Sequence, residues 1–271
     1  MCGICGIIGN EQQNETIVRR MCDIIRHRGP DSDGVYHDGN IYLGHRRLSI
    51  IDLSTGDQPI FNEDKSIVVV FNGEIYNFQE FKDRLIKKGH RFYTSSDTEI
   101  LVHCYEEYGL SFLSELNGIF SFALYDKKRN RLVLVRDHFG VKPLHYYFKD
   151  NLFIFSSEQK AILVHPHVQR IINYNALHCQ VNLRYNQSNE TLFKNIYRVP
   201  PGHYLIWENE NITLDSYYQL QPDPDNSLSE ENVIEGLRDQ LQRAIKSQLL
   251  SDVPIGVYLS GGMDSSSIVA M

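Results

Sequence analysis

The apolar positions of the first two hundred residues fall mostly in short runs that are typical of strands. Residues 67–71 form a β-branched run that leads into Asn72-Gly73, a turn pair. Two further pairs of runs surround polar turns and predict hairpins. Their strands cover residues 118–125 with 131–136, and 144–148 with 152–155.

Residues 78–88 and 98–108 have helical spacing, and Ser96 and Asp97 precede the second of these helices as cap candidates. Helices interspersed among paired strands indicate antiparallel sheets covered by helices. The pattern therefore predicts an α+β layered fold for this part of the chain.

The pattern changes near residue 219. Residues 219–229 hold two prolines and two aspartates and predict a linker. Ser227 and Glu230 then have capping-box spacing. One apolar stripe follows at every fourth position: Val233, Leu237, Leu241, Ile245 and Leu249.

A short strand at 254–259 and a Ser-Gly-Gly turn that opens another helix come next, as in the start of an α/β domain. We expect this domain to be incomplete at Met271. The domains we expect are residues 2–215 and residues 216–271.

Composition excludes some classes of protein. The 271 residues carry 27 basic and 34 acidic side chains, a net charge of −7, which argues against general nucleic-acid binding. No apolar run approaches the roughly 18 residues of a membrane span, and no signal peptide is evident. Five cysteines, an odd number, favour a reducing compartment, so we expect a cytoplasmic protein.

Cys2 becomes the first residue if Met1 is removed, which a small second residue favours. It then carries a thiol together with a free α-amine that can take the thiol proton, so one residue supplies nucleophile and base. Two alternatives are an ordinary small apolar residue and a C-x-x-C redox or zinc pair with Cys5. A zinc site needs a second ligand pair, and the sequence spacing shows none. We expect Cys5 to be a core residue.

Several motifs surround this cysteine: the start MCGICGIIG, RHRGPD at 26–31, GHRRLSI at 44–50, NGEIYN at 72–77, Ser96-Asp97, and DHFGVKP at 137–143. In this order they resemble the class II glutamine amidotransferases, the N-terminal-nucleophile type. The resemblance implies a four-layer α-β-β-α sandwich with the cysteine at the start of a central strand. It also implies hydrolysis of glutamine to glutamate and ammonia through a Cys2 thioester, without a cofactor for this step.

The oxyanion of such a reaction needs donors, each worth about 3 kcal/mol. Asn72 offers a side-chain NH2 and Gly73 an unobstructed backbone N–H, and the resemblance assigns this role to the pair. The alternative is a plain hairpin turn, for which Asn-Gly is the commonest signal.

Glutamine also presents an α-carboxylate and an α-ammonium. A guanidinium suits the carboxylate, and the resemblance assigns this role to Arg47, with Arg46 expected to be solvated. Asp97 is the candidate partner of the ammonium, with Glu74 assisting, although Asp97 could instead cap the following helix. The same pocket is expected to be lined by Leu48, Ser49, Ile50 and Ile51.

Arg26, His27 and Arg28 form a basic cluster before Gly29-Pro30. It is either a solvated turn or, by the resemblance, a loop that covers the glutamine site. No step requires His27 as a base, because the α-amine already fills that role.

The motif SGGMDSS at 260–266 follows the expected strand and opens a helix, the setting of a phosphate site. It lacks the Gly-Lys-Ser/Thr of a Walker loop and resembles the PP-loop of ATP pyrophosphatases. A plain Ser/Gly surface loop is the alternative. The phosphate contacts that the resemblance implies are Ser260, Gly261, Gly262, Asp264 and Ser265, with Asp264 near Mg²⁺.

A class II glutaminase followed by a PP-loop resembles the glutamine-hydrolysing asparagine synthetases. The resemblance implies that ATP converts aspartate to β-aspartyl-AMP, which ammonia then attacks. Three alternatives stay open: another carboxylate as acceptor, a non-catalytic module that binds glutamine or docks partners, and a redox protein. The oligomeric state is also open, a homodimer being one option.

Overall fold

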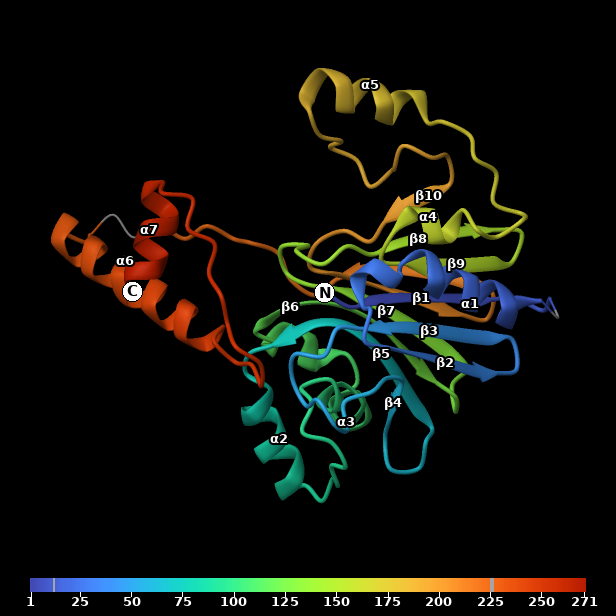
Figure 1. Ribbon diagram of the computed structural model, residues 1–271, viewed down its shortest axis with the longest axis horizontal. Coiled ribbons are helices and arrows are strands. Elements are labelled where there is room, and N and C mark those ends of the chain that lie inside the picture. The colour runs from blue at the N-terminus through green and yellow to red at the C-terminus, as the bar shows by residue number, and fades with distance from the viewer. Residues whose placement is uncertain (12, 225–226) are drawn as a thin grey trace.

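The computed structural model describes residues 1–11, 13–224 and 227–271, and within them two six-stranded antiparallel sheets lie face to face (Figure 1). The first sheet has the order β10-β8-β9-β1-β3-β2. Its strands are β1 (Gly3–Ile8), β2 (Ser32–Asp38), β3 (Ile41–Arg47), β8 (His145–Lys149), β9 (Leu152–Ser156) and β10 (Ile196–Arg198).

The second sheet has the order β12-β11-β7-β6-β5-β4. Its strands are β4 (Ile60–Phe61), β5 (Ile67–Ile75), β6 (Gly118–Asp126), β7 (Arg131–Arg136), β11 (His203–Glu208) and β12 (Asn211–Ser216). The predicted hairpins are confirmed as β6 with β7 and β8 with β9.

Helices cover the outer faces of both sheets. The apolar sides of α1 (Asn14–Ile24) and α4 (Gln159–Ile162) pack on the first sheet. On the second sheet pack α2 (Phe78–Lys87) and α3 (Glu99–Tyr108), the two predicted helices. The short 3-10 helices are Arg26–Arg28 and Ser111–Glu115, and α5 (Tyr174–Leu183) projects from the sandwich.

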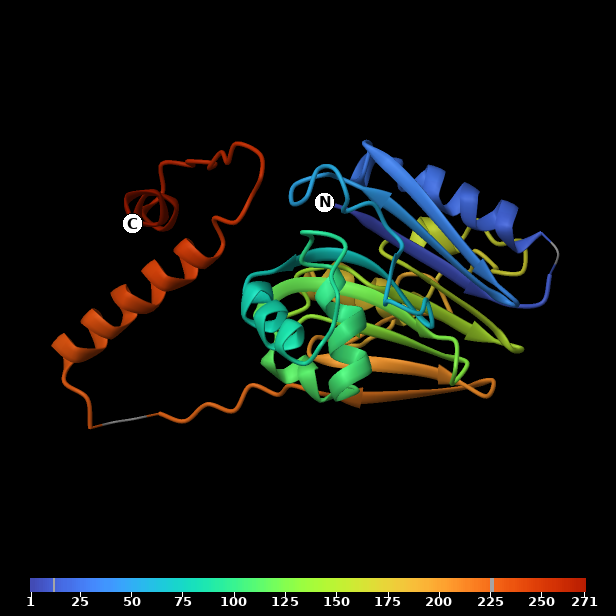
Figure 2. The ribbon, with the colours of Figure 1, turned by 90° about the horizontal axis from the view of Figure 1, so that it is seen from below.

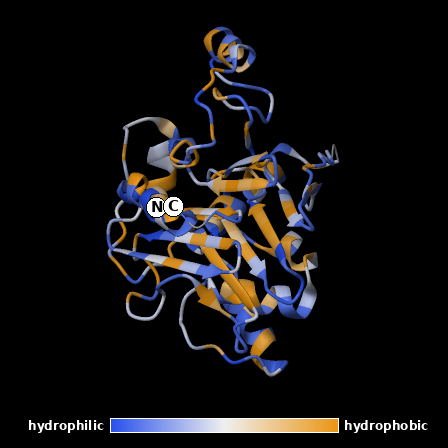
Figure 3. Ribbon diagram, turned by 90° about the vertical axis from the view of Figure 1, so that its right-hand side faces the viewer, coloured by the Kyte–Doolittle hydropathy of each residue, from blue (hydrophilic) through white to orange (hydrophobic). Residues whose placement is uncertain are grey.

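A third apolar cluster fills the space between the sheets, with Ile4 and Leu43 from one side and Val70 and Leu134 from the other. Apolar residues are correspondingly dense on the strands in Figure 3. The four layers are therefore α-β-β-α, and the predicted α+β sandwich is confirmed.

Alternation along β5 decides which side chains face the partner sheet. Val68 and Val70 lie in the cluster between the sheets, whereas Val69 and Phe71 lie under the helices. Since side chains alternate along a strand, Asn72 continues the inter-sheet face. The expected turn at Asn72-Gly73 is therefore wrong: both residues lie inside β5, paired with β6.

The C-terminal region differs from its prediction in two places. The predicted linker 219–229 lies partly outside the described residues, and its described parts form no helix or strand. The helix α6 (Glu230–Ser247) follows, but its N-cap is Ser229, whose Oγ accepts a hydrogen bond from Asn232 N at 3.3 Å, rather than Ser227.

The strand predicted at 254–259 is also wrong, because a strand needs a hydrogen-bonded neighbour and none of the described residues pairs with this segment. The segment leads into α7 (Met263–Ala270). Figure 2 shows α6 and α7 beside the sandwich rather than within it.

Candidate active site

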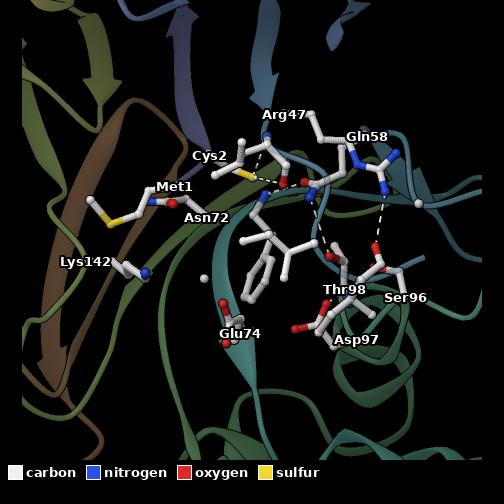
Figure 4. Close-up of a pocket in the computed structure, with 16 residues that line it drawn as sticks. Met1, Cys2, Arg47, Gln58, Asn72, Glu74, Ser96, Asp97, Thr98 and Lys142 are labelled. Atoms are coloured by element: carbon white, nitrogen blue, oxygen red, sulfur yellow. Dashed lines mark hydrogen bonds between the residues drawn. The ribbon is translucent and has the colours of Figure 1, made fainter. Parts of the chain in front are cut away.

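A narrow pocket of about 60 Å³ opens at the end of the sandwich where the chain enters β1 (Figure 4). Every residue that the sequence predicts for the glutamine site lines it, except Ser49, whose backbone N donates to Asp31 Oδ2 at 2.8 Å. The lining residues are Met1, Cys2, Arg47, Leu48, Ile50, Ile51, Gly56, Gln58, Phe71, Asn72, Gly73, Glu74, Ser96, Asp97, Thr98 and Lys142.

The Cys2 thiol is held against the backbone of Leu48. Leu48 N donates to Cys2 Sγ at 3.4 Å, and Sγ lies 3.7 Å from Leu48 O (Figure 4). Burial raises the pKa of the thiol, and the Leu48 N–H acts in the opposite direction because it favours the thiolate. The thiol is thus positioned by a fixed backbone donor at the start of an inner strand.

Arg28, one of the three residues of the basic cluster at 26–28, contacts the backbone of Cys2. Arg28 Nε donates to Cys2 O at 2.9 Å, and Arg28 Nη1 lies 3.1 Å from Glu158 Oε1. His27 Nε2 is 2.8 Å from the same carboxylate oxygen. Arg28 is therefore an anchor for the cysteine backbone, whereas Arg26 and His27 are exposed, as a solvated turn predicts.

Cys5 is fully buried in the core under α1, as predicted, with its Sγ 3.6 Å from Cys22 Sγ. All five cysteines lie in described residues and are free thiols. Cys2 and Cys5 therefore form no disulfide in this structure.

Alternate backbone N–H groups of β5 point away from β6, toward the pocket. Phe71 N donates to Gln58 Oε1 at 2.6 Å, and Ile75 N donates to Asp97 Oδ2 at 2.9 Å. Gly73 lies midway between them, and its N–H points the same way because backbone direction repeats every second residue in a strand. Gly73 therefore presents a donor to the pocket.

Position 73 also has a steric requirement. A Cβ on Gly73 would lie 2.2 Å from the carbonyl oxygen of Ile119 on β6, closer than any real contact. Only glycine lets β5 keep this close approach to β6 while it presents its N–H.

The Asn72 amide is fully buried, and neither Nδ2 nor Oδ1 has a hydrogen-bond partner among the described residues. A buried polar group without a partner costs about 1–3 kcal/mol. Among the described residues that line the pocket, Asn72 is the one whose buried polar atoms lack a partner, which calls for an explanation.

Arg47 is fixed from several sides. Its Nη1 donates to Asp57 Oδ1 at 2.8 Å, and its Nη2 donates to the carbonyl oxygens of Ile51, at 3.2 Å, and Asp52. A Cβ on Gly56 would come within 2.5 Å of Nη2, so the glycine makes room for the guanidinium. These contacts leave Nε and one Nη1 proton to meet a ligand.

The expectation that Arg46 is solvated is wrong. Arg46 is 5% exposed, its Nε donates to Gly29 O at 3.0 Å, and its Nη1 meets Asp33 Oδ1 at 3.1 Å. Its β3 position alternates with Arg47, so the two guanidinium groups leave the strand on opposite faces.

Asp97 is buried, and burial raises its pKa to about 6. Its carboxylate accepts from Ile75 N and lies 3.4 Å from Ser96 Oγ. The alternative that Asp97 caps α3 is wrong, because the N-cap is Thr98. Glu74 lines the same pocket, and burial raises its pKa as well.

The sequence did not assign roles to Gln58, Ser96, Thr98 and Lys142, which all line the pocket. Burial lowers the pKa of Lys142, and the charge of Glu74 acts in the opposite direction. Lys142 and Ser96 lie inside two of the motifs that surround Cys2, which was the available signal. Gln58 lies outside every motif.

The second motif forms an open loop. Gly261 has φ of +77°, Gly262 is the N-cap of α7, and Ser260 Oγ is 2.8 Å from Ser265 Oγ. The first N–H groups of α7 have no acceptor within the helix, and free N–H groups next to hydroxyls suit phosphate. Asp264 is the carboxylate in that turn, and Mg²⁺ commonly takes one or two carboxylates plus phosphate oxygens.

Between α6 and this loop, the chain returns to the pocket. Asp252 N donates to Ile50 O at 2.9 Å, and Asp52 N donates to Asp252 Oδ2 at 2.7 Å. The C-terminal region thus contacts the loop that carries the pocket wall after Arg47.

No described helix is long and apolar enough to cross a membrane.

Cys2 directly precedes β1, an inner strand of the α-β-β-α sandwich. This arrangement is typical of the N-terminal-nucleophile class of amidotransferase folds. One solved structure similar to it, the glutamine phosphoribosylpyrophosphate amidotransferase of Bacillus subtilis, has a TM-score of 0.60 at 20% identity, over 99% of this chain and 63% of that one. The glutamine amidotransferase domain family matches residues 1–218, so the chain belongs to that family.

The asparagine synthase family matches residues 236–271. Asparagine synthetase [glutamine-hydrolyzing] 2 of Bacillus subtilis is 40% identical over 99% of this chain and 38% of its own length. Amidase chry2 of Gibberella zeae is 38% identical over the whole chain and 42% of its own length. The chain thus spans about two-fifths of these relatives' length.

Proposed function

We propose that this chain hydrolyses glutamine to glutamate and ammonia through a thioester on Cys2. The observation that carries the proposal is the meeting of three features in one pocket. They are the Cys2 thiol, the unpartnered buried amide of Asn72, and the inward N–H of Gly73.

Removal of Met1 begins the mechanism, because the nitrogen of Cys2 is otherwise part of a peptide bond. Met1 itself lines the pocket, so its removal also enlarges the site. The freed amine takes the thiol proton, and the Leu48 N–H stabilises the resulting thiolate. The thiolate then attacks the side-chain amide carbon of glutamine.

The tetrahedral oxyanion receives hydrogen bonds from Asn72 Nδ2 and Gly73 N. Collapse breaks the carbon–nitrogen bond, and the protonated amine delivers its proton to the leaving ammonia. Water, activated by the same amine, cleaves the thioester to glutamate and restores the thiol. The protein's catalytic groups in this scheme are therefore the thiol and amine of Cys2 and the two donors of β5.

The remaining pocket residues bind the backbone of glutamine. Arg47, oriented by Asp57, takes the α-carboxylate with its remaining donors. Asp97, assisted by Glu74, takes the α-ammonium, which favours the ionised form of a carboxyl whose pKa burial raises to about 6. The backbone of Leu48, Ile50 and Ile51 completes the wall.

We further propose that residues 2–215 are a glutaminase domain and that residues 216–271 begin an ATP-dependent synthetase domain. Ser260, Gly261, Gly262 and Ser265 would hold phosphate, and Asp264 would stand near Mg²⁺. ATP bound there would convert aspartate to β-aspartyl-AMP with release of pyrophosphate, and ammonia from the first site would displace AMP to give asparagine. The similarity to glutamine-hydrolysing asparagine synthetases over the whole chain supports this product. The free thiols support a reducing, cytoplasmic setting.

One observation favours a second acceptor. Amidase chry2, at 38% identity, lies within the range of the Bacillus subtilis asparagine synthetases, which are 35% to 40% identical to this chain. A different carboxylate could therefore take the place of aspartate without any change at the glutamine site.

Mass spectrometry of the mature N-terminus, combined with an assay of ammonia release from glutamine, tests the proposal. We expect Cys2 as first residue and loss of activity in Cys2→Ala. Cys179→Ala is the matched control, because Cys179 lies on α5 outside the pocket, and it should retain full activity. Retained Met1, or ammonia release from Cys2→Ala at the wild-type rate, would refute the mechanism.

A further inference from the structure

Four titratable side chains meet at a second place, away from the glutamine pocket. Glu63 lies in the turn between β4 and β5, His90 follows α2, and His103 and Glu106 lie on α3. Each offers one ligand atom, and these atoms all lie within 4.8 Å of one another. The four residues come from three separate segments, which is why no sequence spacing revealed them.

The buried member of the cluster is His103, which is 0% exposed. Its Nε2 lies 3.5 Å from Glu99 Oε1. Glu99 is a carboxylate that accepts from Tyr93 N, Thr94 N and Thr94 Oγ1, so it can only accept from the imidazole as well. The proton of neutral His103 is therefore on Nε2.

This tautomer leaves the Nδ1 lone pair of His103 facing the cluster. Nδ1 is buried and has no hydrogen-bond partner among the described residues, and it lies 3.3 Å from Glu63 Oε2. A lone pair and a carboxylate oxygen at this distance repel each other unless a cation lies between them.

His90 repeats the arrangement at the surface side. Its Nε2 lies 3.5 Å from Glu107 Oε2, and its Nδ1 lies 3.5 Å from Glu63 Oε1. In both histidines, one ring nitrogen faces Glu63 and the other faces a carboxylate outside the cluster, which is Glu99 for His103 and Glu107 for His90. A metal-ligating histidine is typically oriented in this way by a carboxylate behind it.

The spacing suits a tetrahedral ion. Two ligands about 2.1 Å from Zn²⁺ lie about 3.4 Å apart when the angle between them is tetrahedral. Glu63 Oε2 lies 3.3 Å from His103 Nδ1, and the other oxygen, Oε1, lies 3.5 Å from His90 Nδ1, so each imidazole has a Glu63 oxygen close to that distance. Glu106 completes a set of two imidazoles and two carboxylates; it is exposed, and its Oε2 accepts a hydrogen bond from Asn62 Nδ2 at 3.1 Å.

We propose that Glu63, His90, His103 and Glu106 bind one divalent transition-metal ion of the zinc type. A single dication satisfies both imidazoles, whereas two imidazolium ions with ring centroids 5.0 Å apart would repel each other. The ion joins the β4–β5 turn to α3 and to the segment before it. Since α3 begins beside Asp97 and Thr98, the ion also braces one wall of the glutamine pocket from outside.

Zinc binding to the whole chain in a Cys2→Ala background tests the proposal, because this substitution removes the pocket thiol as a competing ligand. Chelator-treated protein should bind one Zn²⁺ by calorimetry and show a higher melting temperature with the metal. Co²⁺ should give the visible absorption bands of a tetrahedral nitrogen and oxygen site.

Surface variants keep the test independent of folding defects at buried His103. Glu63→Gln combined with Glu106→Gln should abolish the Zn²⁺ effect on melting. Glu107→Gln, which removes the carboxylate behind His90, should weaken Zn²⁺ affinity about 10–100-fold. His167→Gln is the matched control, because His167 pairs with Glu11 at 3.0 Å on another part of the surface.

The control variant should bind Zn²⁺ like its parent. Absence of bound metal, or binding that survives the double glutamate substitution, would overturn the proposal. Neither result touches the glutaminase proposal, which depends on Cys2 activity.

Discussion

The sandwich and the C-terminal region use the same kind of apolar pattern with opposite results. In β5 and β6 the apolar positions are buried, and Phe122 is 1% exposed. In α6 the apolar stripe is equally regular, yet Leu237 is 59% exposed and no residue of the helix is buried. A periodic pattern thus predicts the element, while burial depends on whether a partner surface lies against it.

The two candidate sites differ in the same way. In the sandwich, the Asn72 amide is buried and has no hydrogen-bond partner among the described residues. In the C-terminal loop, the hydroxyls of Ser260 and Ser265 are hydrogen-bonded to each other at the surface. The amide at the first site thus has no partner among the described residues, whereas the two hydroxyls at the second already have each other.

The largest expected effect tests burial directly. Phe122→Ala should lower the free energy of unfolding by about 3–5 kcal/mol, because it leaves a cavity in the core. Leu237→Ala should change it by no more than about 0.5 kcal/mol. Urea denaturation followed by fluorescence checks both, since Trp207 is the single tryptophan and lies buried in the sandwich. Similar losses in both variants would end the distinction between the regions.

The next effect concerns the orphaned amide. Asn72→Ala should reduce kcat for glutamine hydrolysis about 10²–10³-fold, because the oxyanion loses one donor. Asn211→Ala, at an exposed asparagine of β12, is the matched control and should be unaffected. An Asn72→Ala enzyme with normal kcat would show that the unpartnered amide serves no transition state.

A smaller effect follows from the pKa of about 6 at Asp97. Binding of the glutamine ammonium needs the ionised carboxylate, so the Kd of Cys2→Ala for glutamine should rise about tenfold per unit as pH falls below 6. Calorimetry between pH 7 and 5 measures this change. With Asp97→Asn added, binding should be weak and should lose most of this pH dependence, and Glu74, whose pKa burial also raises, accounts for what remains.

The free energy of unfolding should depend on pH in the opposite direction to glutamine binding, because the protonated form of Asp97 favours the fold. The pKa of Asp97 is raised above its ordinary value of 3.8, so its protonated form stabilises the fold fully below about pH 4. That contribution is lost as pH rises through about 6. Wild-type and Asp97→Asn unfolding curves that keep a constant separation from pH 4 to 7 would contradict the raised pKa.

The smallest effect is local to the C-terminal region. Ser229→Ala removes the N-cap of α6 and should destabilise that helix by about 1 kcal/mol. Hydrogen exchange of α6 amides should become faster, while exchange in β5 and β6 stays the same. Faster exchange in the sandwich as well would mean that the two regions unfold as one unit.

The sequence predicted the layered fold because strand and helix periods differ and because hairpin turns are local. It also predicted most of the pocket, since those residues lie in short motifs. It failed where long-range contacts decide. Asn72-Gly73 has the local signature of a turn, but pairing with β6 keeps it in a strand. Arginine is usually a surface residue, but the guanidinium of Arg46 is buried because Gly29 O and Asp33 Oδ1 accept its hydrogen bonds.

The hydrogen bonds of Asp252 to Ile50 and Asp52 connect residues about 200 positions apart. A shorter protein that ended at residue 215 would leave the Ile50 carbonyl and the Asp52 N–H to water. The loop that forms this wall of the pocket would then lose both of its hydrogen bonds to Asp252. Removal of the C-terminal region should therefore leave the apolar core of the sandwich intact and loosen the loop at Ile50 and Asp52 beside the pocket.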